Sequence, residues 1–278
     1  MADATKENAA SETSYVFDNA AQETHCRFEA LPALYDAGTI RHLGERGVEP
    51  GWQCLEVGAG SGSIAAWLAE RVAFSGSVLA TDINPRFMQS LRHPCLEVLQ
   101  HDVTTDPLPS AAYHLIHARL VLSHLPARDR VLGRLAATLR PGGWIVIEEF
   151  DTASVSHGPT LDSTPIPFRT LEAMRAVLAT NGVDLEYGRR VPALLREQGL
   201  IEIGSESRSF LWTGASIGAR LMQANFEQLR AAILASGVVS EREFAADHAR
   251  LNDRGIGFPS PTMWATWGRR PIRGNGVL

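Results

Sequence analysis

The chain has 278 residues, of which 45% are hydrophobic and 21% are charged, and this is the composition of a globular protein with a sizeable core. Its formal net charge of -5 argues against a protein that holds a polyanion by bulk charge, so we expect no nucleic-acid partner. No apolar run approaches the length of a membrane span, and we expect no membrane partner either.

Cysteine usage and the first residues indicate the compartment. The chain has three cysteines, Cys26, Cys54 and Cys95, and no two of them form a CxxC motif. An odd number without such a motif predicts neither a disulfide framework nor a zinc site, and we expect no bound metal. Residues 1–13 are polar, lack the apolar core of a signal peptide and are predicted to form a disordered tail. We therefore expect a cytoplasmic protein.

Residues 14–48 are predicted to form two N-terminal helices. They come at the place in the chain where a segment can fold back over the open end of a sheet. Tyr15 and Arg27 belong to this segment and are candidates for contact with a ligand bound at that end. A homo-oligomer is possible, because the helix pattern suits both a cap on the same subunit and a cap on a neighbour.

Residues 49–150 alternate short apolar runs with helical patterns, which is typical of a parallel sheet built from βαβ units. Helices are predicted after the first, second and fourth strands, and the second of these covers residues 85–92. The predicted strands cover residues 52–58, 77–82, 96–103, 113–122 and 144–150.

The rhythm changes after residue 151. Residues 151–255 are predicted to supply a substrate cap with helices at 168–182, 191–200 and 216–235, together with a late strand at 201–212. Residues 256–278 hold a last strand at 262–270 and a tail. We expect residues 14–278 to form one α/β domain, in which a Rossmann-like, seven-stranded, mostly parallel sheet ends with an antiparallel last strand.

Three glycines, Gly58, Gly60 and Gly62, separate the first strand from the following helix. A strand, a glycine loop and a helix N-terminus let the backbone approach a ligand closely and point unpaired N–H groups at it. Dinucleotides and adenosyl compounds both use this geometry. The dinucleotide pattern G-x-G-x-x-A is satisfied at 60–65, and Asp82 stands where its ribose-binding acid is expected, so the loop alone does not discriminate between the two.

The acidic residues do discriminate. Glu56 precedes the loop at the mouth of an otherwise apolar strand, where a carboxylate repels a pyrophosphate but suits an ammonium group. Asp102 follows the third strand, so Glu56, Asp82 and Asp102 are expected along one rim of the sheet. A ligand with an amine, a ribose diol and an adenine amino group can use all three acids.

The motifs ExGxGxG at 56–62, ATD at 80–82, HDV at 101–103 and LRPGGWIVIEE at 139–149 together resemble the class I S-adenosylmethionine-dependent methyltransferases. The resemblance covers roughly residues 14–150. Within that family the chain looks most like the bacterial small-molecule and natural-product branch near the ubiquinone/menaquinone C-methyltransferases.

The resemblance implies S-adenosyl-L-methionine as the cofactor and assigns its parts to residues. The methionine part is placed against the first strand and the glycine loop, the ribose hydroxyls at the second strand and the adenine between the second and third strands. The cofactor-binding residues so implied, with the two from the N-terminal segment, are Glu56, Gly58, Gly60, Gly62, Asp82, Ile83, Asp102, Val103, Arg119, Tyr15 and Arg27.

Methyl transfer from a sulfonium is an in-line displacement, for which a protein mainly supplies alignment and exclusion of water. If the acceptor is a hydroxyl or phenol, a base is needed near the methyl group, and His124 is the candidate catalytic residue. Its alternative role is a hydrogen bond within the turn before Pro126. The apolar content of the cap favours a small, largely apolar substrate of secondary metabolism, possibly aromatic or prenylated, with a C, O or N acceptor.

Two other functions are compatible with the glycine loop. An NAD(P)-dependent Rossmann oxidoreductase is one, although Tyr187 is not followed by a lysine in a Tyr-x-x-x-Lys pair. A non-catalytic protein on the methyltransferase fold is the other. Glu148 and Glu149 end the fifth strand, and as neighbours in a strand they are expected to point to opposite faces, so that at most one faces the ligand.

Overall fold

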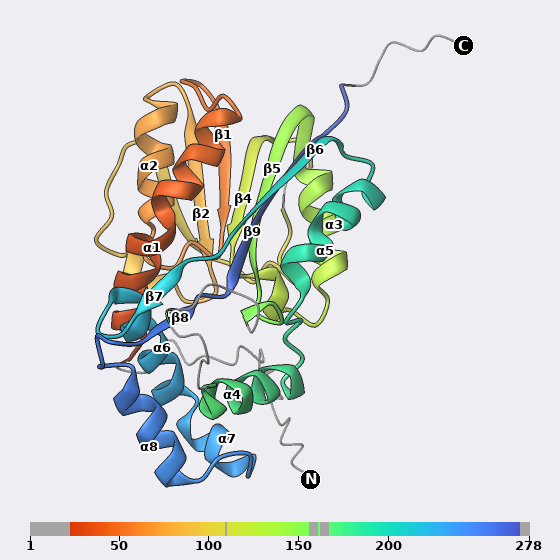
Figure 1. Ribbon diagram of the computed structural model, residues 1–278. Coiled ribbons are helices and arrows are strands. Elements are labelled where there is room, and N and C mark those ends of the chain that lie inside the picture. Colours follow the sequence, from red (N-terminus) through yellow and green to blue (C-terminus); the bar gives the residue numbers. More distant parts are fainter. Residues whose placement is uncertain (1–22, 109, 156–160, 162–166, 273–278) are drawn as a thin grey trace, which may run out of the picture.

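The computed structural model describes residues 23–108, 110–155, 161 and 167–272 (Figure 1). The predicted tail 1–13, Tyr15 and the residues after 272 lie outside the described residues. The centre of the fold is a seven-stranded sheet in the order β3-β2-β1-β4-β5-β9-β6. Its strands are β1 (Gln53–Val57), β2 (Ser77–Asp82), β3 (Leu96–Gln100), β4 (Tyr113–Arg119), β5 (Leu139–Asp151), β6 (Ile201–Arg208) and β9 (Thr262–Arg269).

Strand direction follows the predicted pattern. β1 pairs in parallel with β2 and β4, and parallel pairs also join β2 to β3 and β4 to β5. β9 runs antiparallel to both of its neighbours, β5 and β6. The sheet is therefore parallel except for its last strand, which confirms the predicted fold class.

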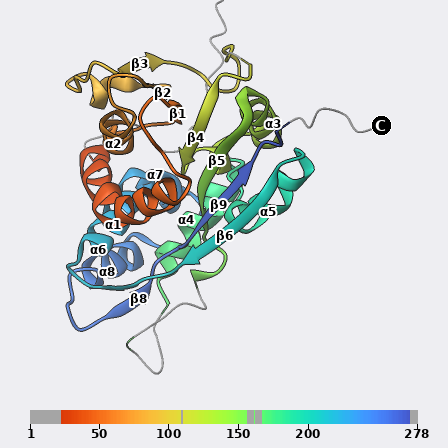
Figure 2. The same ribbon diagram turned by 90° about the horizontal axis from the view of Figure 1, so that it is seen from above.

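Helices cover both faces of the sheet. Figure 2 shows α1 (Glu23–Glu45) and α2 (Ser63–Val72) on one side and α3 (Arg128–Thr138) and α5 (Tyr187–Glu197) on the other. The alternation of side chains along β1 explains this arrangement. Cys54 belongs to the apolar cluster that contains Leu68 of α2, whereas Leu55 belongs to the cluster that contains Leu132 of α3. Strands that are apolar on both faces need such a cover.

The cap lies beyond the carboxyl ends of β1, β2 and β4 (Figure 1). It has an apolar core of its own, which includes Met174, Met222 and Phe244. Its last helix was not predicted from the sequence, and it begins with a capping box between Ser240 and Glu243. The cap elements are α4 (Arg169–Thr180), α6 (Ile217–Gln228), α7 (Arg230–Ala235), α8 (Glu241–Arg250) and the paired strands β7 (Leu211–Thr213) and β8 (Gly257–Pro259).

Several predicted elements have other bounds in the structure. The helix expected at 85–92 is a short 3₁₀ turn, η1 (Pro85–Met88), because so short a helix is marginal and Met88 is the only buried residue of this turn. β4 ends at Arg119 rather than at residue 122, since Leu120 adopts a φ of 58° and the turn η2 (Leu122–His124) follows. Of the segment 14–48, in which two helices are predicted, the described part from residue 23 onward holds α1, and residues 14–22 lie outside the described residues.

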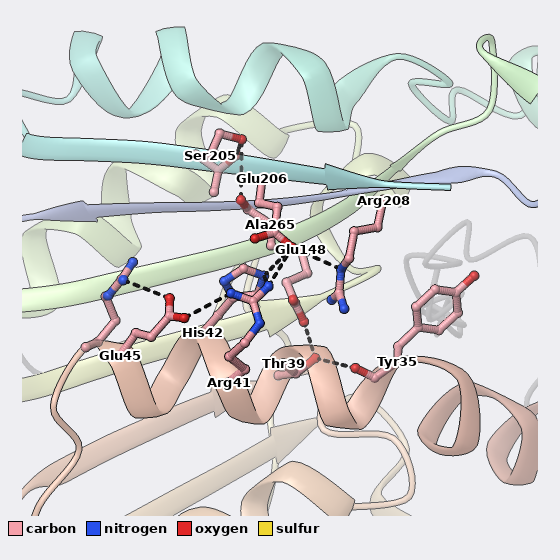
Figure 3. Close-up of polar contacts among 12 residues, drawn as sticks. Tyr35, Thr39, Arg41, His42, Glu45, Glu148, Ser205, Glu206, Arg208 and Ala265 are labelled. Atoms are coloured by element: carbon pink, nitrogen blue, oxygen red, sulfur yellow. Dashed lines mark hydrogen bonds and ion pairs between the residues drawn. The ribbon is translucent and has the colours of Figure 1, made fainter. Parts of the chain in front are cut away.

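Polar contacts hold α1 against the far edge of the sheet (Figure 3). Arg41 donates to Glu206 of β6 at 2.5 Å, and Arg208 lies 3.4 Å from the same carboxylate. Gly38 makes room for this contact, because a Cβ atom there would overlap the Arg208 guanidinium. Within the described ranges, neither α1 nor any other helix is both long and apolar enough to cross a membrane.

Candidate functional site

A cavity of about 510 Å³ lies between the carboxyl ends of the central strands and the cap. Its size falls within the usual range for a small-molecule site. All of the predicted site residues line it except Gly62 and Tyr15, and Tyr15 lies outside the described residues. Those that line it are Arg27, Glu56, Gly58, Gly60, Asp82, Ile83, Asp102, Val103, Arg119 and His124.

The glycine loop has the backbone that its sequence predicts. Gly58 and Gly60 have φ angles of 64° and 56°, in the region that side chains disfavour. A Cβ atom on Gly58 would lie 2.3 Å from Cγ2 of Val121, so the loop is as close to the following segment as a glycine permits. Gly62 also has a positive φ, of 79°, but faces Leu91 and forms the turn into α2 rather than part of the cavity wall.

Asp82, at the end of β2, holds two loops together. One of its carboxylate oxygens accepts the Gly60 N–H at 3.0 Å and the other accepts the Asn84 N–H at 2.9 Å. Burial raises the pKa of Asp82, and the backbone hydrogen bonds only partly offset that effect. Each oxygen keeps a further lone pair for a ligand hydroxyl on the cavity side.

Asp102 and His101 form the wall beyond β3. Asp102 accepts hydrogen bonds from the backbone and hydroxyl of Thr104 at 2.8 and 2.6 Å. Partial burial works to raise the pKa of Asp102, but these hydrogen bonds hold it below its ordinary value. His101 is 7% exposed, and neither of its ring nitrogens has a partner among the described residues. This histidine belongs to the HDV motif at 101–103, but the sequence pattern indicates no role for it.

A network of buried charged side chains lies behind Glu56. His117 of β4 contacts the Glu56 carboxylate through Nδ1 at 2.8 Å and the Glu148 carboxylate through Nε2 at 3.3 Å. Burial opposes the imidazolium form, but the two carboxylates outweigh it and raise the pKa of His117 to about 9. The charged imidazole therefore fixes one oxygen of Glu56. The sequence signal for His117 was a polar residue between the apolar Ile116 and Ala118 in a central strand, and it was missed.

The same network of side chains continues into α1. Thr39 donates to Glu148, and Arg119 donates to the Thr39 hydroxyl at 2.9 Å and to Asp36 at 2.8 Å (Figure 3 shows Thr39 and Glu148). Arg119 thus lines the cavity while its guanidinium binds α1. α1 therefore shares one polar network with β1, β4 and β5, and this network holds α1 along the cavity.

Glu149 points to the other face of the sheet, as expected from its position next to Glu148. Its carboxylate accepts the N–H groups of Val121, Leu122 and Ser123 at 3.0, 2.6 and 3.4 Å and the Ser123 hydroxyl at 2.8 Å. Burial raises the pKa of Glu149 to about 7 despite these bonds. Neither glutamate lines the cavity. Glu149 instead fixes the turn that carries His124.

His124 is the last residue of that turn, η2, and lines the cavity. Burial, with smaller effects from Arg27 and Arg128, lowers the pKa of His124 to about 3. The imidazole is therefore neutral at pH 7 and a weak general base. Within the described ranges no three acidic, histidine or cysteine side chains are arranged to hold a metal ion.

Comparison with known proteins points to methyltransferases. Residues 55–147 match the family model described as a methyltransferase domain. Over this part the chain is similar to known methyltransferases. It is 34% identical over 145 residues to methyltransferase str2 of Strobilurus tenacellus, with 51% of this chain and 50% of that protein aligned. It is 27% identical over 147 residues to the ubiquinone/menaquinone biosynthesis C-methyltransferase UbiE of Bordetella parapertussis, with 49% and 57% aligned.

The chain therefore spans about half the length of the curated relatives that it matches. Among solved structures, it resembles phosphoethanolamine N-methyltransferase 2 of Haemonchus contortus, which was determined with phosphomonomethylethanolamine and S-adenosylhomocysteine. The TM-score is 0.57 at 14% identity, and the match covers 90% of this chain and 58% of that one. At this identity the likeness shows the fold alone, and that fold is the Rossmann-like methyltransferase fold predicted from the motifs.

Proposed function

We propose that the protein is an S-adenosylmethionine-dependent methyltransferase that acts on a small, largely apolar metabolite. One observation carries the proposal. Glu56, Asp82 and Asp102 come from the ends of three different strands and line a single cavity together with Gly58 and Gly60. The matching family model supports the reaction, and the likeness to UbiE supports a small-molecule acceptor.

The residues present fit such a cofactor. S-adenosylmethionine carries an ammonium group, a ribose diol and an adenine amino group, and it supplies an electrophilic methyl group on its sulfonium. Glu56 offers a carboxylate for the ammonium group, and His117 holds the opposite oxygen of that carboxylate. Asp82 offers acceptors for the ribose hydroxyls, and Asp102 an acceptor for the adenine amino group. Gly58 and Gly60 line the cavity without a side chain, and a Cβ atom on Gly58 would overlap Val121 of the same lining.

The protein's contribution to the transfer is then positioning and exclusion of water. Leu120, Val121 and Phe150 separate the strand ends from the cap within the cavity lining. Because His124 is neutral and weakly basic, it serves as a hydrogen-bonding group in this proposal rather than as a proton acceptor. A substrate that needs little help from a base, such as an electron-rich carbon or an amine, suits this site best.

The oxidoreductase alternative is less well supported. A dinucleotide would set its pyrophosphate beside the buried carboxylate of Glu56, which accepts from His117 and has little room to turn away. Tyr187, the first residue of α5, is buried and does not line the cavity.

The proposal is tested by calorimetric titration with S-adenosylhomocysteine and, separately, with NADH. We expect binding of S-adenosylhomocysteine alone. Asp82→Ala removes charge-assisted hydrogen bonds worth about 1.5–3 kcal/mol, so affinity should fall by about 10- to 100-fold. Asp82→Asn keeps an acceptor for the loop and should lose less. Asp129→Ala, on the exposed start of α3, is the matched control and should bind as the unaltered protein does.

Binding of NADH alone would establish the oxidoreductase instead. If S-adenosylhomocysteine binds but Asp82→Ala binds it equally well, the site assignment is wrong although the reaction class survives. If neither ligand binds, the proposed function fails and a non-catalytic role on this fold takes its place.

A further inference from the structure

The cap end of the cavity is apolar. Six apolar side chains from α1, α4, α6 and the segment before α5 line this end: Leu31, Met174, Leu178, Leu185, Leu221 and Met222. Such a wall favours a ligand that removes apolar surface from water. It does not by itself distinguish one apolar ligand from another.

Charge at this end is already compensated. Asp184 is the acidic residue of the cavity lining that comes from the cap side of the described chain, and it pairs with Arg190 and, at 3.7 Å, with Arg128. Arg27 donates to the Gln228 amide at 3.2 Å. A cationic substrate would therefore find no available carboxylate among the described residues of the cap, and an isolated charge is costly to bury.

Two polar atoms of the cap lining lack partners. Oδ1 of Asn225 and Nε1 of Trp212 are buried, and neither has a hydrogen bond in the described part of the chain. Both residues line the cavity, and Trp212 is 5% exposed. Buried polar atoms are nearly always hydrogen-bonded in folded proteins, so an unmatched acceptor and an unmatched donor beside one cavity indicate a ligand that satisfies them.

The fold holds both groups in place. Asn225 lies on the same face of α6 as Leu221 and Met222, since residues spaced by three or four positions share a helix face. Trp212 lies flat against Gly218, where a Cβ atom would come within 2.3 Å of its ring. Phe258 packs edge-on against the same indole, with ring centroids 6.1 Å apart. The unmatched groups are therefore fixed features of the cap and not mobile surface side chains.

We infer that the substrate is a neutral, mainly apolar molecule bearing a hydroxyl group that Asn225 and Trp212 recognise. This inference rests on the proposed function and specifies its substrate class. A hydroxyl both donates and accepts, so it can satisfy the Asn225 carbonyl and the Trp212 N–H. A carboxylate or phosphate offers no donor to the Asn225 carbonyl, and a plain hydrocarbon leaves both groups unmatched.

The test uses 2-naphthol, naphthalene and 2-naphthoate as probes, measured by equilibrium dialysis at pH 7 with and without saturating S-adenosylhomocysteine. The three share one ring system and differ in having a hydroxyl group, no polar group or a charged group. We expect 2-naphthol to bind at least about fivefold more tightly than naphthalene, as one good hydrogen bond provides, and 2-naphthoate to bind more weakly than 2-naphthol.

Variants then locate the preference. Asn225→Leu and Trp212→Phe should each lower the affinity for 2-naphthol nearly to the affinity for naphthalene. Neither variant should change the affinity for naphthalene by much. Gln223→Leu is the matched control: it makes the same kind of change on α6, but the Gln223 amide bonds His248 and Asn252 and does not line the cavity. This variant should keep the full preference for 2-naphthol.

The inference is overturned if 2-naphthoate binds more tightly than 2-naphthol, if the three probes bind alike, or if none binds. Thermal unfolding of each variant shows whether it is folded, and the comparison of the three probes on the unaltered protein stands even if a variant is not. If the unaltered protein does not bind S-adenosylhomocysteine but still prefers 2-naphthol, the proposed function is refuted while the recognition of a hydroxyl group stands.

Discussion

Replacing His117 tests the network of buried charged side chains behind the cavity. The imidazole lies between the carboxylates of Glu56 and Glu148, and all three side chains are almost fully buried. His117→Gln keeps a donor of similar reach but removes the positive charge. Two buried carboxylates then face each other without compensation, and breaking such a buried arrangement typically costs about 3–5 kcal/mol of unfolding free energy.

The pH dependence gives an independent magnitude. The pKa of His117 rises from 6.5 to about 9 in the folded protein, which corresponds to about 3 kcal/mol of stabilisation of the charged form. Because the folded pKa lies above the unfolded one, this contribution is complete below pH 6.5 and is lost as the pH rises through 9. The difference in unfolding free energy between the unaltered protein and His117→Gln should therefore be about 3 kcal/mol at pH 6 and should shrink by pH 9.5.

Urea unfolding at pH 6.0, 7.5 and 9.5 measures this difference, and the comparison within each pH cancels the titration of other groups such as Glu149. His25→Gln is the control: this histidine is largely exposed and pairs with Glu29 at 3.2 Å within α1, so its loss should cost less than about 0.5 kcal/mol. A difference below about 1 kcal/mol at pH 6, or one that grows as the pH rises, would show that His117 is not charged in the folded protein.

Two further predictions concern the cavity wall. Gly58→Ala should destabilise the protein by about 1–3 kcal/mol and abolish binding of S-adenosylhomocysteine in calorimetry, because φ is 64° and the added Cβ would meet Val121 at 2.3 Å. Gly44→Ala, in an open position of α1, should stabilise it by up to about 1 kcal/mol, and equal effects of the two changes in urea unfolding would contradict this reasoning. His101→Leu should leave the unfolding free energy unchanged or raised, since it removes two buried nitrogens without partners among the described residues, but should weaken S-adenosylhomocysteine about three- to tenfold. Unchanged affinity in calorimetry would show that the ligand does not satisfy this imidazole.

The order of strands and helices and the chemistry of the strand ends were determined by the sequence itself. Alternation of short apolar runs with helical patterns predicts a parallel sheet, and in a parallel sheet the carboxyl ends of strands meet at one edge. Glu56, Asp82 and Asp102 lie at or just beyond the carboxyl ends of three strands, so their common rim follows from local pattern alone. Gly58 and Gly60 were likewise identified locally, because only a tight strand-to-helix turn needs glycines so closely spaced.

Only the tertiary structure decided which side chains meet. His117 stands between Glu56 and Glu148 because three strands that are distant in the chain pair in one register, and a shift of one residue would turn each side chain to the opposite face. Gly62 was assigned to the ligand by its spacing, but the turn into α2 points it at Leu91.

The cap shows the same limit more strongly. Asn225 is an ordinary polar position of an amphipathic helix in the sequence, and its place at the cavity depends on how α6 packs against α1. Periodicity predicts which face of a helix is buried, but not what that face meets. The contacts between elements far apart in the chain are set by the packing of the whole fold, and they decide which polar groups reach the ligand.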